Sequence, residues 1–272
     1  MFPEERKNRI KQIVLENRSI TVSSLVKIFN VSKETIRRDL KCLQEDNIIK
    51  KTYGVATLSD ELNNINVPTI QKRKFKEQRE KKAIAEEAIK LLCNNKYILL
   101  DAGSTTECIA KELNKINYTE NICIITNGIN VAEECSKISY ANVYLLGGKL
   151  QKRTLSITGP QVIREIKSFN IDIAVIGVTG ISNGGFYSSN IYEIEVKETM
   201  VSVARKVVVV ADHTKFGKHG LKPFCGFENV DYLITSDLLD NSTLKRIKDN
   251  YKTKIIIAQM ASDVKSVSTF WG

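Results

Sequence analysis

Hydrophobic positions near the start of the chain recur at the spacing of an α-helix. Ile10 and Val14 lie four residues apart among charged and amide side chains, which predicts an amphipathic helix over residues 4–16 with one buried face. Thr21 is suited to cap a short second helix, and residues 30–32 form a break after it. The pattern therefore predicts a helix, a shorter helix and a turn.

A third helix and a hairpin are predicted to follow this turn. Ser32 caps residues 33–44, in which Ile36 and Leu40 face inward and leave a row of basic side chains outside. A recognition helix has this layout, because its first turn enters the major groove, where arginine reaches guanine edges and smaller polar groups bind phosphates. Residues 47–58 surround a glycine and predict two short strands, the wing. The residues that we expect to contact DNA are Ser32, Lys33, Thr35, Arg37, Arg38, Lys41, Lys50, Lys51 and Tyr53.

The pattern changes after the wing. Residues 59–75 are polar and then basic, and we interpret them as an interdomain linker. The basic run either adds phosphate contacts or begins the next helix, and we favour the helix. Beyond residue 83, apolar runs of strand length alternate with helical patterns, which predicts a mainly parallel sheet covered by helices, with ligands at the strand ends. Seven strands are expected to begin near Tyr97, Ile122, Val143, Ile171, Val207, Tyr232 and Ile255.

One of these strand ends has the composition of an anion site. Residues 98–106 lead from an apolar strand through Gly103 into a helix expected over residues 107–113. Glycine lets the backbone approach a ligand closely, and the amides and hydroxyls at a helix N-terminus attract a phosphate. The stretch also fits an ordinary strand-to-helix turn with a Ser or Thr cap. No GxxxxGK[ST] sequence is present, which argues against a nucleotide-hydrolysing P-loop.

The charge of the chain is concentrated at its N-terminal end. The formal net charge is +10 over 272 residues, and residues 1–82 hold 19 Lys or Arg against 11 Asp or Glu. A basic segment on a nearly neutral body is typical of proteins that bind nucleic acid, because neutralising phosphates releases counterions. A solvated charged surface would give the same count.

Composition also narrows the class of protein. No apolar run approaches the roughly 18 residues that span a bilayer, and the polar start of the chain lacks a secretory signal, so we expect a cytoplasmic protein with no membrane partner. The six cysteines form no CxxC pairs, and the only histidines are His213 and His219. We therefore predict no metal site, no cofactor and no catalytic residues.

Several motifs resemble those of one known family. Residues 31–40, VSKETIRRDL, resemble the recognition-helix signature VSxxTIRRDL of DeoR-type bacterial regulators, whose wing usually reads HGGA where residues 53–56 read YGVA. Residues 79–85, REKKAIA, look like the family's EK-IA helix. The series LDAGSTT, TN, LGG, a glycine-rich segment and DHTKF is similar to the family's sensor domain, with His213 where serine is common. The resemblance runs from about residue 3 to residue 237.

The resemblance implies a fold and a ligand site. It implies an α/β protein with a small N-terminal winged helix-turn-helix and a larger C-terminal sensor domain similar to the ribose-5-phosphate isomerase and CoA-transferase fold. The residues that it places in the effector site are Asp101, Gly103, Ser104, Thr105, Thr106, Thr126, Asn127, Gly147, Gly148, Lys197, Asp212 and Lys215. By residue type, the hydroxyls of residues 104–106 bind phosphate, the lysines balance its charge, and the Asp and Asn side chains bind sugar hydroxyls.

These patterns divide the chain into two domains and a linker. We expect the winged helix-turn-helix over residues 1–58, the linker over 59–75, and an effector-binding and oligomerisation domain over 76–272. A palindromic operator read by one winged helix per chain requires at least a dimer, so we expect a homo-oligomer, either dimer or tetramer.

The predicted function is that of a sequence-specific transcriptional regulator. We expect a repressor of a sugar or carbohydrate catabolic operon, whose affinity for a double-stranded DNA operator is controlled by a phosphorylated sugar or related metabolite. One alternative is a sugar-phosphate isomerase-like enzyme with an appended DNA-binding module. Another is an RNA-binding protein, for which the sequence offers no stacking-aromatic motif.

Overall fold

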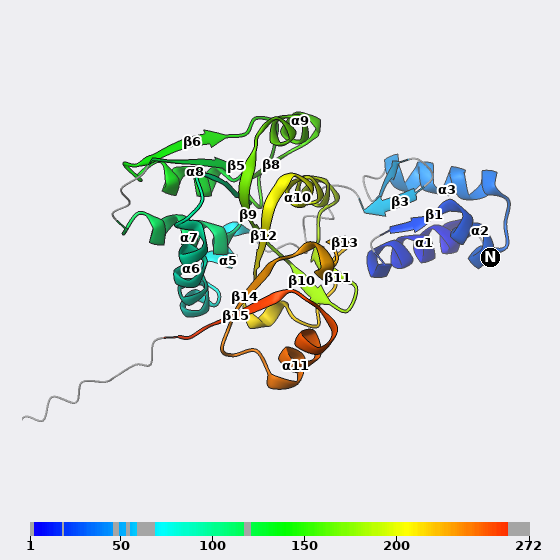
Figure 1. Cartoon of the computed structure of the whole chain (residues 1–272). Helices are drawn as coiled ribbons and strands as arrows, with labels where there is room; N and C mark the ends of the chain where they lie inside the picture. The colour runs from blue at the N-terminus through cyan, green and yellow to red at the C-terminus, as the bar shows by residue number, and fades with distance from the viewer. Residues whose placement is uncertain are drawn as a thin grey trace, which may run out of the picture.

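The chain folds into a small N-terminal group of elements and a larger α/β group, coloured blue and cyan to red in Figure 1. This computed structural model describes residues 3–17, 19–45, 49–52, 55–58, 69–116 and 121–260. Within these ranges no helix is both long and apolar enough to cross a bilayer.

The N-terminal group is a winged helix-turn-helix. Its elements are α1 (Pro3–Asn17), β1 (Ser19–Thr21), α2 (Val22–Phe29), α3 (Lys33–Glu45), β2 (Ile49–Thr52) and β3 (Val55–Leu58). The strands pair antiparallel in the order β1-β3-β2, so that β2 and β3 form the wing. The three predicted helices and the wing are confirmed, with small shifts at their ends.

Local hydrogen bonds explain where the two central helices begin. The Thr21 hydroxyl accepts the N–H of Ser24 at 3.1 Å, and the Ser32 hydroxyl accepts the N–H of Thr35 at 3.1 Å, as the sequence predicted. Asn30 ends α2 with a φ of 48°, a left-handed conformation that asparagine tolerates. The helices pack around a core made of Ile10, Val14, Val22, Leu25, Ile36, Leu40 and Leu43.

A seven-stranded sheet organises the C-terminal group. Its strands are β4 (Tyr97–Leu100), β5 (Ile122–Thr126), β6 (Ala141–Leu145), β9 (Ile171–Gly177), β12 (Ala204–Val210), β14 (Tyr232–Ser236) and β15 (Lys254–Ala258). They lie in the order β15-β14-β12-β9-β4-β5-β6, and every neighbouring pair is parallel. These are the seven strands that the apolar runs predicted, and the α/β fold class is confirmed.

Helices cover both faces of this sheet (Figure 1). They are α6 (Gln78–Leu92), α7 (Ser104–Leu113), α8 (Ile129–Cys135), α9 (Pro160–Ser168), α10 (Ile191–Val203) and α11 (Asn241–Asn250). Leu99 packs in the core formed with α9, α10 and α11, whereas Ile98 and Leu100 pack in the core formed with α6, α7 and α8. Helix α7 begins three residues before the predicted residue 107, so residues 104–106 are its first turn.

The end of the predicted linker is folded. Residues 70–74 form a short helix, α5 (Ile70–Lys74), whose first residue is buried and donates its N–H to the carbonyl of Arg153 at 2.8 Å. A break at residues 75–77 separates α5 from α6, and Glu77 there has a φ of 50°. The prediction that the basic run begins the long helix was therefore wrong, because the chain turns between the two helices.

Two small sheets were not predicted. One pairs β7 (Lys149–Gln151) with β8 (Ser156–Thr158), and the other has the order β10 (Gly180–Ser182), β11 (Gly185–Ser188), β13 (Lys222–Cys225). Strands of three or four residues are too short to show alternation in the sequence. They lie in the connections that follow β6, β9 and β12, beyond the carboxyl ends of the large sheet.

Candidate functional site

The outer face of α3 carries most of the residues predicted to contact DNA. Thr35 is half-buried, and the exposed residues are Ser32, Lys33, Arg37, Arg38 and Lys41. The Ser32 and Thr35 hydroxyls lie 2.9 Å apart within the helix cap. Arg37 Nη1 lies 3.6 Å from Glu34, an exposed pair that holds the arginine only weakly. The exposed basic row has the layout of a recognition helix.

The predicted wing contacts are described less completely. The backbones of Lys50 and Lys51 belong to β2, but their side chains lie outside the described part of the chain, as does all of Tyr53. Their contacts with DNA stay a prediction.

A buried ion pair joins α1 to α3. Arg6 Nε lies 2.6 Å from Asp39 Oδ2, and Arg6 Nη2 donates to Asp39 Oδ1 at 3.1 Å. Both side chains are less than a tenth exposed, at 8% and 7%. The bidentate geometry fixes the guanidinium and carboxylate in one plane, so it also fixes how α3 sits on α1. Asp39 thus orients the helix whose Arg37 and Arg38 face outward, a role that the sequence analysis did not single out.

The order of the strands places a crevice between β4 and β9. From β4 the chain continues to β5 and β6 on one side, and then returns to β9 on the other side of β4. In such sheets a ligand cleft forms where the connections diverge, at the carboxyl ends of the strands. A cavity of about 420 Å³ lies there, among the residues after β4 and β9, helix α10 and the short 3-10 helix η1 (His213–Lys215).

This cavity brings together part of the predicted effector site. The predicted residues that line it are Gly103, Ser104, Thr105, Thr106, Lys197, Asp212 and Lys215. The polar residues that line it without having been predicted are Arg73, Lys76, Lys81, Thr179, Ser188, Ser189, Glu193, Thr214, Lys218 and His219. A site with this much positive charge and this many hydroxyls suits an anionic, hydroxylated ligand.

The N-terminus of α7 contributes backbone donors to the cavity wall. Gly103 is the N-cap and has no side chain to bond the first turn, so the N–H groups of residues 104–106 keep no side-chain cap. Gly103 has a φ of 178°, which any residue adopts, but a Cβ atom there would lie 3.1 Å from Thr106 Oγ1. The Thr106 hydroxyl is buried and donates to the Gly103 carbonyl at 3.2 Å. The amides and Ser104 are therefore better placed than Thr106 to bind an anion.

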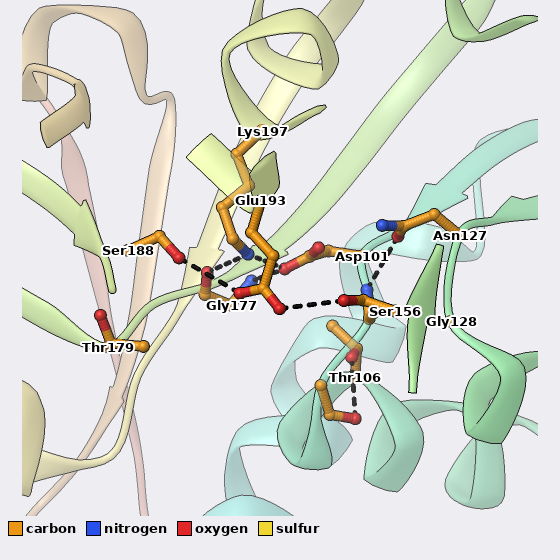
Figure 2. A network of polar contacts seen from close by, with 12 residues as sticks. Asp101, Thr106, Asn127, Gly128, Ser156, Gly177, Thr179, Ser188, Glu193 and Lys197 are labelled. Carbon is orange, nitrogen blue, oxygen red and sulfur yellow. Dashed lines mark hydrogen bonds and ion pairs between the residues drawn. The ribbon is translucent and has the colours of Figure 1, made fainter. Parts of the chain in front are cut away.

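Asp101 and Lys197 form a buried pair at the floor of the site (Figure 2). The Lys197 ammonium donates to the Asp101 carboxylate and, at 2.8 Å, to the carbonyl of Gly177. The N–H of Gly177 donates to Asp101 Oδ2 at 3.0 Å. Burial raises the pKa of the Asp101 carboxyl, and the Lys197 ammonium opposes that rise. Asp101 therefore ties the end of β4 to the end of β9 and holds Lys197 at the cavity, which Asp101 itself does not line.

Glu193 lies one helical turn before Lys197 and also faces the cavity (Figure 2). Its carboxylate accepts the hydroxyl of Ser156 at 2.9 Å and the hydroxyl of Ser188 at 3.3 Å. These two donors hold the carboxylate in place, and its remaining lone pairs are able to accept hydroxyl groups of a ligand. Glu195, on the same helix, is exposed.

Asp212 and Lys215 form a second ion pair, in which the carboxylate is buried, the lysine is partly exposed and both residues line the cavity. Lys215 Nζ lies 3.3 Å from Asp212 Oδ2, and Asp212 Oδ1 accepts the N–H of Thr214 at 3.1 Å as the cap of η1. Burial alone would raise the pKa of the Asp212 carboxyl, but Lys215 and Thr214 overcome it and hold that pKa below its ordinary value. Asp212 is therefore an anion that keeps Lys215 at the cavity wall.

Besides Asp101, four predicted residues do not line the cavity. The Asn127 side chain accepts the N–H of Ala102 at 3.0 Å and donates to the carbonyl of Ile157, so it braces the loop after β4. The Thr126 hydroxyl accepts the N–H of Gly128 at 3.0 Å. Gly147 donates its N–H to Glu165, and Gly148 has a φ of 151° with the carbonyl of Thr158 only 2.8 Å from where a Cβ would be. These four residues, Thr126, Asn127, Gly147 and Gly148, shape loops beside the site.

The unpredicted lining residues come mainly from two regions. Arg73 and Lys76 belong to the basic run for which the sequence analysis weighed DNA contact against the start of a helix, and Lys81 belongs to the REKKAIA stretch. Ser188 is the last residue of β11 in the small sheet that sequence patterns could not reveal, and Thr179 and Ser189 lie next to the ends of β10 and β11. The composition of the basic run was a usable signal, but only the fold shows that it reaches the cavity.

His213, whose role was open, bonds to the start of α6. Its Nδ1 lies 2.8 Å from Glu80 Oε1, and its backbone N–H donates to Glu80 Oε2 at 3.1 Å. The Ser236 hydroxyl donates to the same carboxylate. Burial tends to raise the pKa of Glu80, but these donors outweigh it and lower the pKa. Glu77 also has a carboxylate oxygen within 4.8 Å of the Glu80 carboxylate and the His213 ring, while His213 and Glu80 contact each other directly.

The fold and the cavity together define a class of protein. A winged helix with a basic recognition helix is joined to an α/β domain with a polar cavity at its topological switch point, which is the construction of a ligand-responsive transcriptional regulator. Residues 6–61 match the family model described as "DeoR-like helix-turn-helix domain", and residues 76–237 match "DeoR C terminal sensor domain". The chain belongs to the DeoR family of transcriptional regulators.

Curated relatives align over nearly the whole chain. The HTH-type transcriptional regulator GolR of Listeria innocua is 34% identical over 92% of this chain and 96% of its own length. The HTH-type transcriptional repressor GlcR of Bacillus subtilis is 32% identical over 95% of this chain and 98% of its own length. The glycerol-3-phosphate regulon repressor of Escherichia coli is 30% identical over 92% of this chain and 98% of its own length. These relatives are transcriptional regulators rather than enzymes, as predicted for this chain.

Solved structures match a smaller part of the chain than the curated relatives do. Ribose 5 phosphate isomerase A from Neisseria gonorrhoeae aligns with 50% of this chain and 52% of its own, at 17% identity and a TM-score of 0.36. A likeness of this extent says nothing about activity.

Proposed function

We propose that the protein is a repressor of a sugar or carbohydrate catabolic operon, and that a phosphorylated sugar or related metabolite bound in the sensor cavity controls its affinity for a double-stranded DNA operator. The observation that carries the proposal is the cavity itself, where uncapped amides of α7 meet Lys81, Lys197 and Lys215. Backbone amides at a helix N-terminus and ammonium groups are the usual ligands of a phosphate. Two relatives, the repressor GlcR and the glycerol-3-phosphate regulon repressor, support the same function by their names.

The rest of the cavity suits the sugar part of such a ligand. Glu193 offers carboxylate oxygens, and Thr179 and Ser189 offer hydroxyls at the same wall. Sugar hydroxyls both donate and accept, so a mixed lining of this kind pairs with them. The volume of about 420 Å³ is ample for one small phosphorylated metabolite.

The proposal divides the work between the domains predicted from the sequence. Residues 1–58 bind the operator, and residues 76–272 bind the effector and hold the chains of a dimer or tetramer together. A two-fold operator needs two recognition helices in a fixed relation, which one chain does not supply. The enzyme alternative is less well supported, because the relatives are regulators and the carboxylate of Asp101 is bonded to Lys197 instead of facing the cavity.

Loss of Arg37 or Arg38 should weaken operator binding without affecting the effector site. Each arginine in the major groove contributes roughly 1–3 kcal/mol, so Arg37→Ala and Arg38→Ala should each raise the operator Kd by about 10- to 100-fold. The measurement is fluorescence anisotropy with operator DNA at fixed salt, beside the thermal shift caused by the effector. Lys167→Ala, an exposed basic residue of α9, serves as the control. Unchanged affinity in both arginine variants would mean that α3 is not the recognition helix.

Filling the anion site should abolish the response to effector. A ligand at one hundred times its Kd stabilises the folded state by about 2.7 kcal/mol, which raises the Tm of a domain of this size by about 5–10 °C. We expect this shift from one phosphorylated sugar and not from its unphosphorylated form, and we expect Ser104→Leu to lose it. Ser168→Leu, at the exposed end of α9, is the matched control. If Ser104→Leu kept the full shift, the phosphate would bind elsewhere.

A further inference from the structure

The sensor cavity is lined in part by the segment that connects the two domains. Arg73 lies in α5 and Lys76 in the break before α6, and both line the cavity. Residues 69–77 are the first described residues after the wing, so the chain enters the sensor along the cavity wall. We call residues 69–77 the junction segment. A ligand in the cavity therefore lies next to the stretch of chain that leads to the DNA-binding domain.

Lys81 holds the junction segment against the cavity. Its ammonium donates to the backbone carbonyls of Arg73 and Lys76, and the side chain is buried. An ammonium has three N–H groups, so one remains after these two bonds, and Lys81 lines the cavity. Burial lowers the pKa of Lys81, partly opposed by the charge of Asp212. A bound anion would satisfy the remaining N–H while the other two keep the junction segment in place.

Arg73 has an unused donor in this arrangement. Its Nε atom is buried and has no hydrogen-bond partner among the described residues, although the side chain lines the cavity. A buried guanidinium N–H without a partner is uncommon, because it loses its bond to water and gains nothing in return. The unpartnered Nε therefore points to a ligand group that accepts from it.

The junction segment is also fastened to the helix whose N-terminus faces the cavity. Lys74 Nζ lies 2.8 Å from Glu107 Oε1 of α7, and Glu107 is almost fully buried. Ile70 donates its N–H to the carbonyl of Arg153, in the turn between β7 and β8. Both ends of α5 are thus tied to the sensor, and its middle carries Arg73 toward the cavity.

We propose that Arg73 and Lys76 are ligand-binding residues, and that an anionic group of the ligand bridges them to the N-terminus of α7 and thereby fixes the junction segment. This inference rests on the proposed function, because it concerns the same cavity, and it adds the regulation of that site. The ligand class is a small molecule with a phosphate, whose several acceptor oxygens are able to bind amides and a guanidinium at once. Ligand binding then changes the freedom of the chain at the point where it leaves for the DNA-binding domain.

The test uses trypsin, because Lys72, Arg73, Lys74 and Lys76 place cleavable bonds within the junction segment. The full-length protein is digested with inorganic phosphate as the probe, and with sodium chloride at matched ionic strength as the blank. At ten times its Kd, phosphate should slow cleavage of these bonds roughly tenfold, while a synthetic tryptic peptide in the same tube is cut at an unchanged rate. The Kd for phosphate is measured separately by thermal shift.

Two variants of neighbouring residues separate ligand contact from general charge. Arg73→Gln should raise the Kd for phosphate by roughly tenfold or more, as expected for loss of a charge-assisted bond, and should remove the protection of the bonds after Lys74 and Lys76. Lys72→Gln removes the same charge from an exposed residue that does not line the cavity, and should behave as the native protein does.

The outcomes distinguish this inference from the proposed function. If Ser104→Leu abolishes phosphate binding but Arg73→Gln leaves both the Kd and the protection unchanged, the anion site stands and the bridge to the junction segment is wrong. If neither phosphate nor any sugar phosphate binds the native protein, the proposed function fails and this inference fails with it. If Lys72→Gln and Arg73→Gln had equal effects, the change would reflect the overall charge of the segment, and the proposed contact between the ligand and Arg73 would be wrong.

Discussion

Replacing Asp39 by alanine is expected to destabilise the winged helix strongly while the sensor domain keeps its stability. The substitution leaves the Arg6 guanidinium buried and without its carboxylate, and breaking such a pair costs about 3–5 kcal/mol in a deep core. The pair lies in a small domain and not in a deep core, so we expect the lower end of this range, about 3 kcal/mol. A domain of this size holds only roughly 3–8 kcal/mol in total.

Differential scanning calorimetry of the full-length protein checks this result. We expect the transition of the N-terminal domain to move to much lower temperature and operator binding to be lost, while the sensor transition and its shift with effector stay unchanged. The double variant Arg6→Met with Asp39→Leu replaces the pair by apolar side chains of similar size and should recover most of the stability. An unaltered first transition in Asp39→Ala would show that the ion pair does not hold α1 on α3.

The second large effect is expected at the floor of the sensor cavity. Lys197→Met leaves the Asp101 carboxylate buried without its cation, and among the described residues the N–H of Gly177 is then its one remaining donor. We expect a loss of about 3–5 kcal/mol of sensor stability at neutral pH, together with loss of effector binding. Asp101→Asn combined with Lys197→Met removes the uncompensated charge, keeps an acceptor for Gly177, and should restore most of the stability but not the binding.

The pH dependence gives an independent check of the same variant. Burial raises the pKa of Asp101 in the folded protein, and removal of Lys197 takes away the group that opposes this rise. A carboxyl whose pKa is raised by folding costs stability as the pH rises through that pKa, and costs little once it is protonated. The loss of sensor-domain stability caused by Lys197→Met should therefore be smaller at about pH 5 than at about pH 8. If the loss of stability grew on acidification instead, the unpaired Asp101 carboxylate would not be its cause.

The recognition helix and the sheet were predictable because their signals are local. Ile36 and Leu40 repeat at helical spacing, Ser32 precedes the first turn, and strand β9 has an unbroken apolar run over residues 173–176. The start of α7 was misplaced by three residues because Ser and Thr after a glycine fit a loop and a first turn equally well. Packing of α7 against the sheet decides that residues 104–106 form the first turn of the helix and not a loop.

The cavity was predictable only in part. Residues within four positions of a strand end, such as Ser104 and Asp212, were found because the ends of parallel strands meet at one edge of a sheet. Arg73 and Glu193 were not assigned to the site, because nothing near them in the sequence shows which wall they face. Asn127 follows a strand in the same way as Asp101, yet its side chain is hydrogen-bonded to the backbone of Ala102 and Ile157 and does not reach the cavity.

By itself the sequence determined the two kinds of domain, the recognition helix, the seven strands and the family motifs, since each of these depends on residues that are close together in the chain. Tertiary structure alone decided that Arg6 pairs with Asp39, that Lys197 reaches Asp101, and that the junction segment lines the sensor cavity. Such contacts join residues that are tens of positions apart, and many partners of suitable charge are available to each. Only the packing of helices on one another or on the sheet brings one of those partners within hydrogen-bond distance and removes the water from around it.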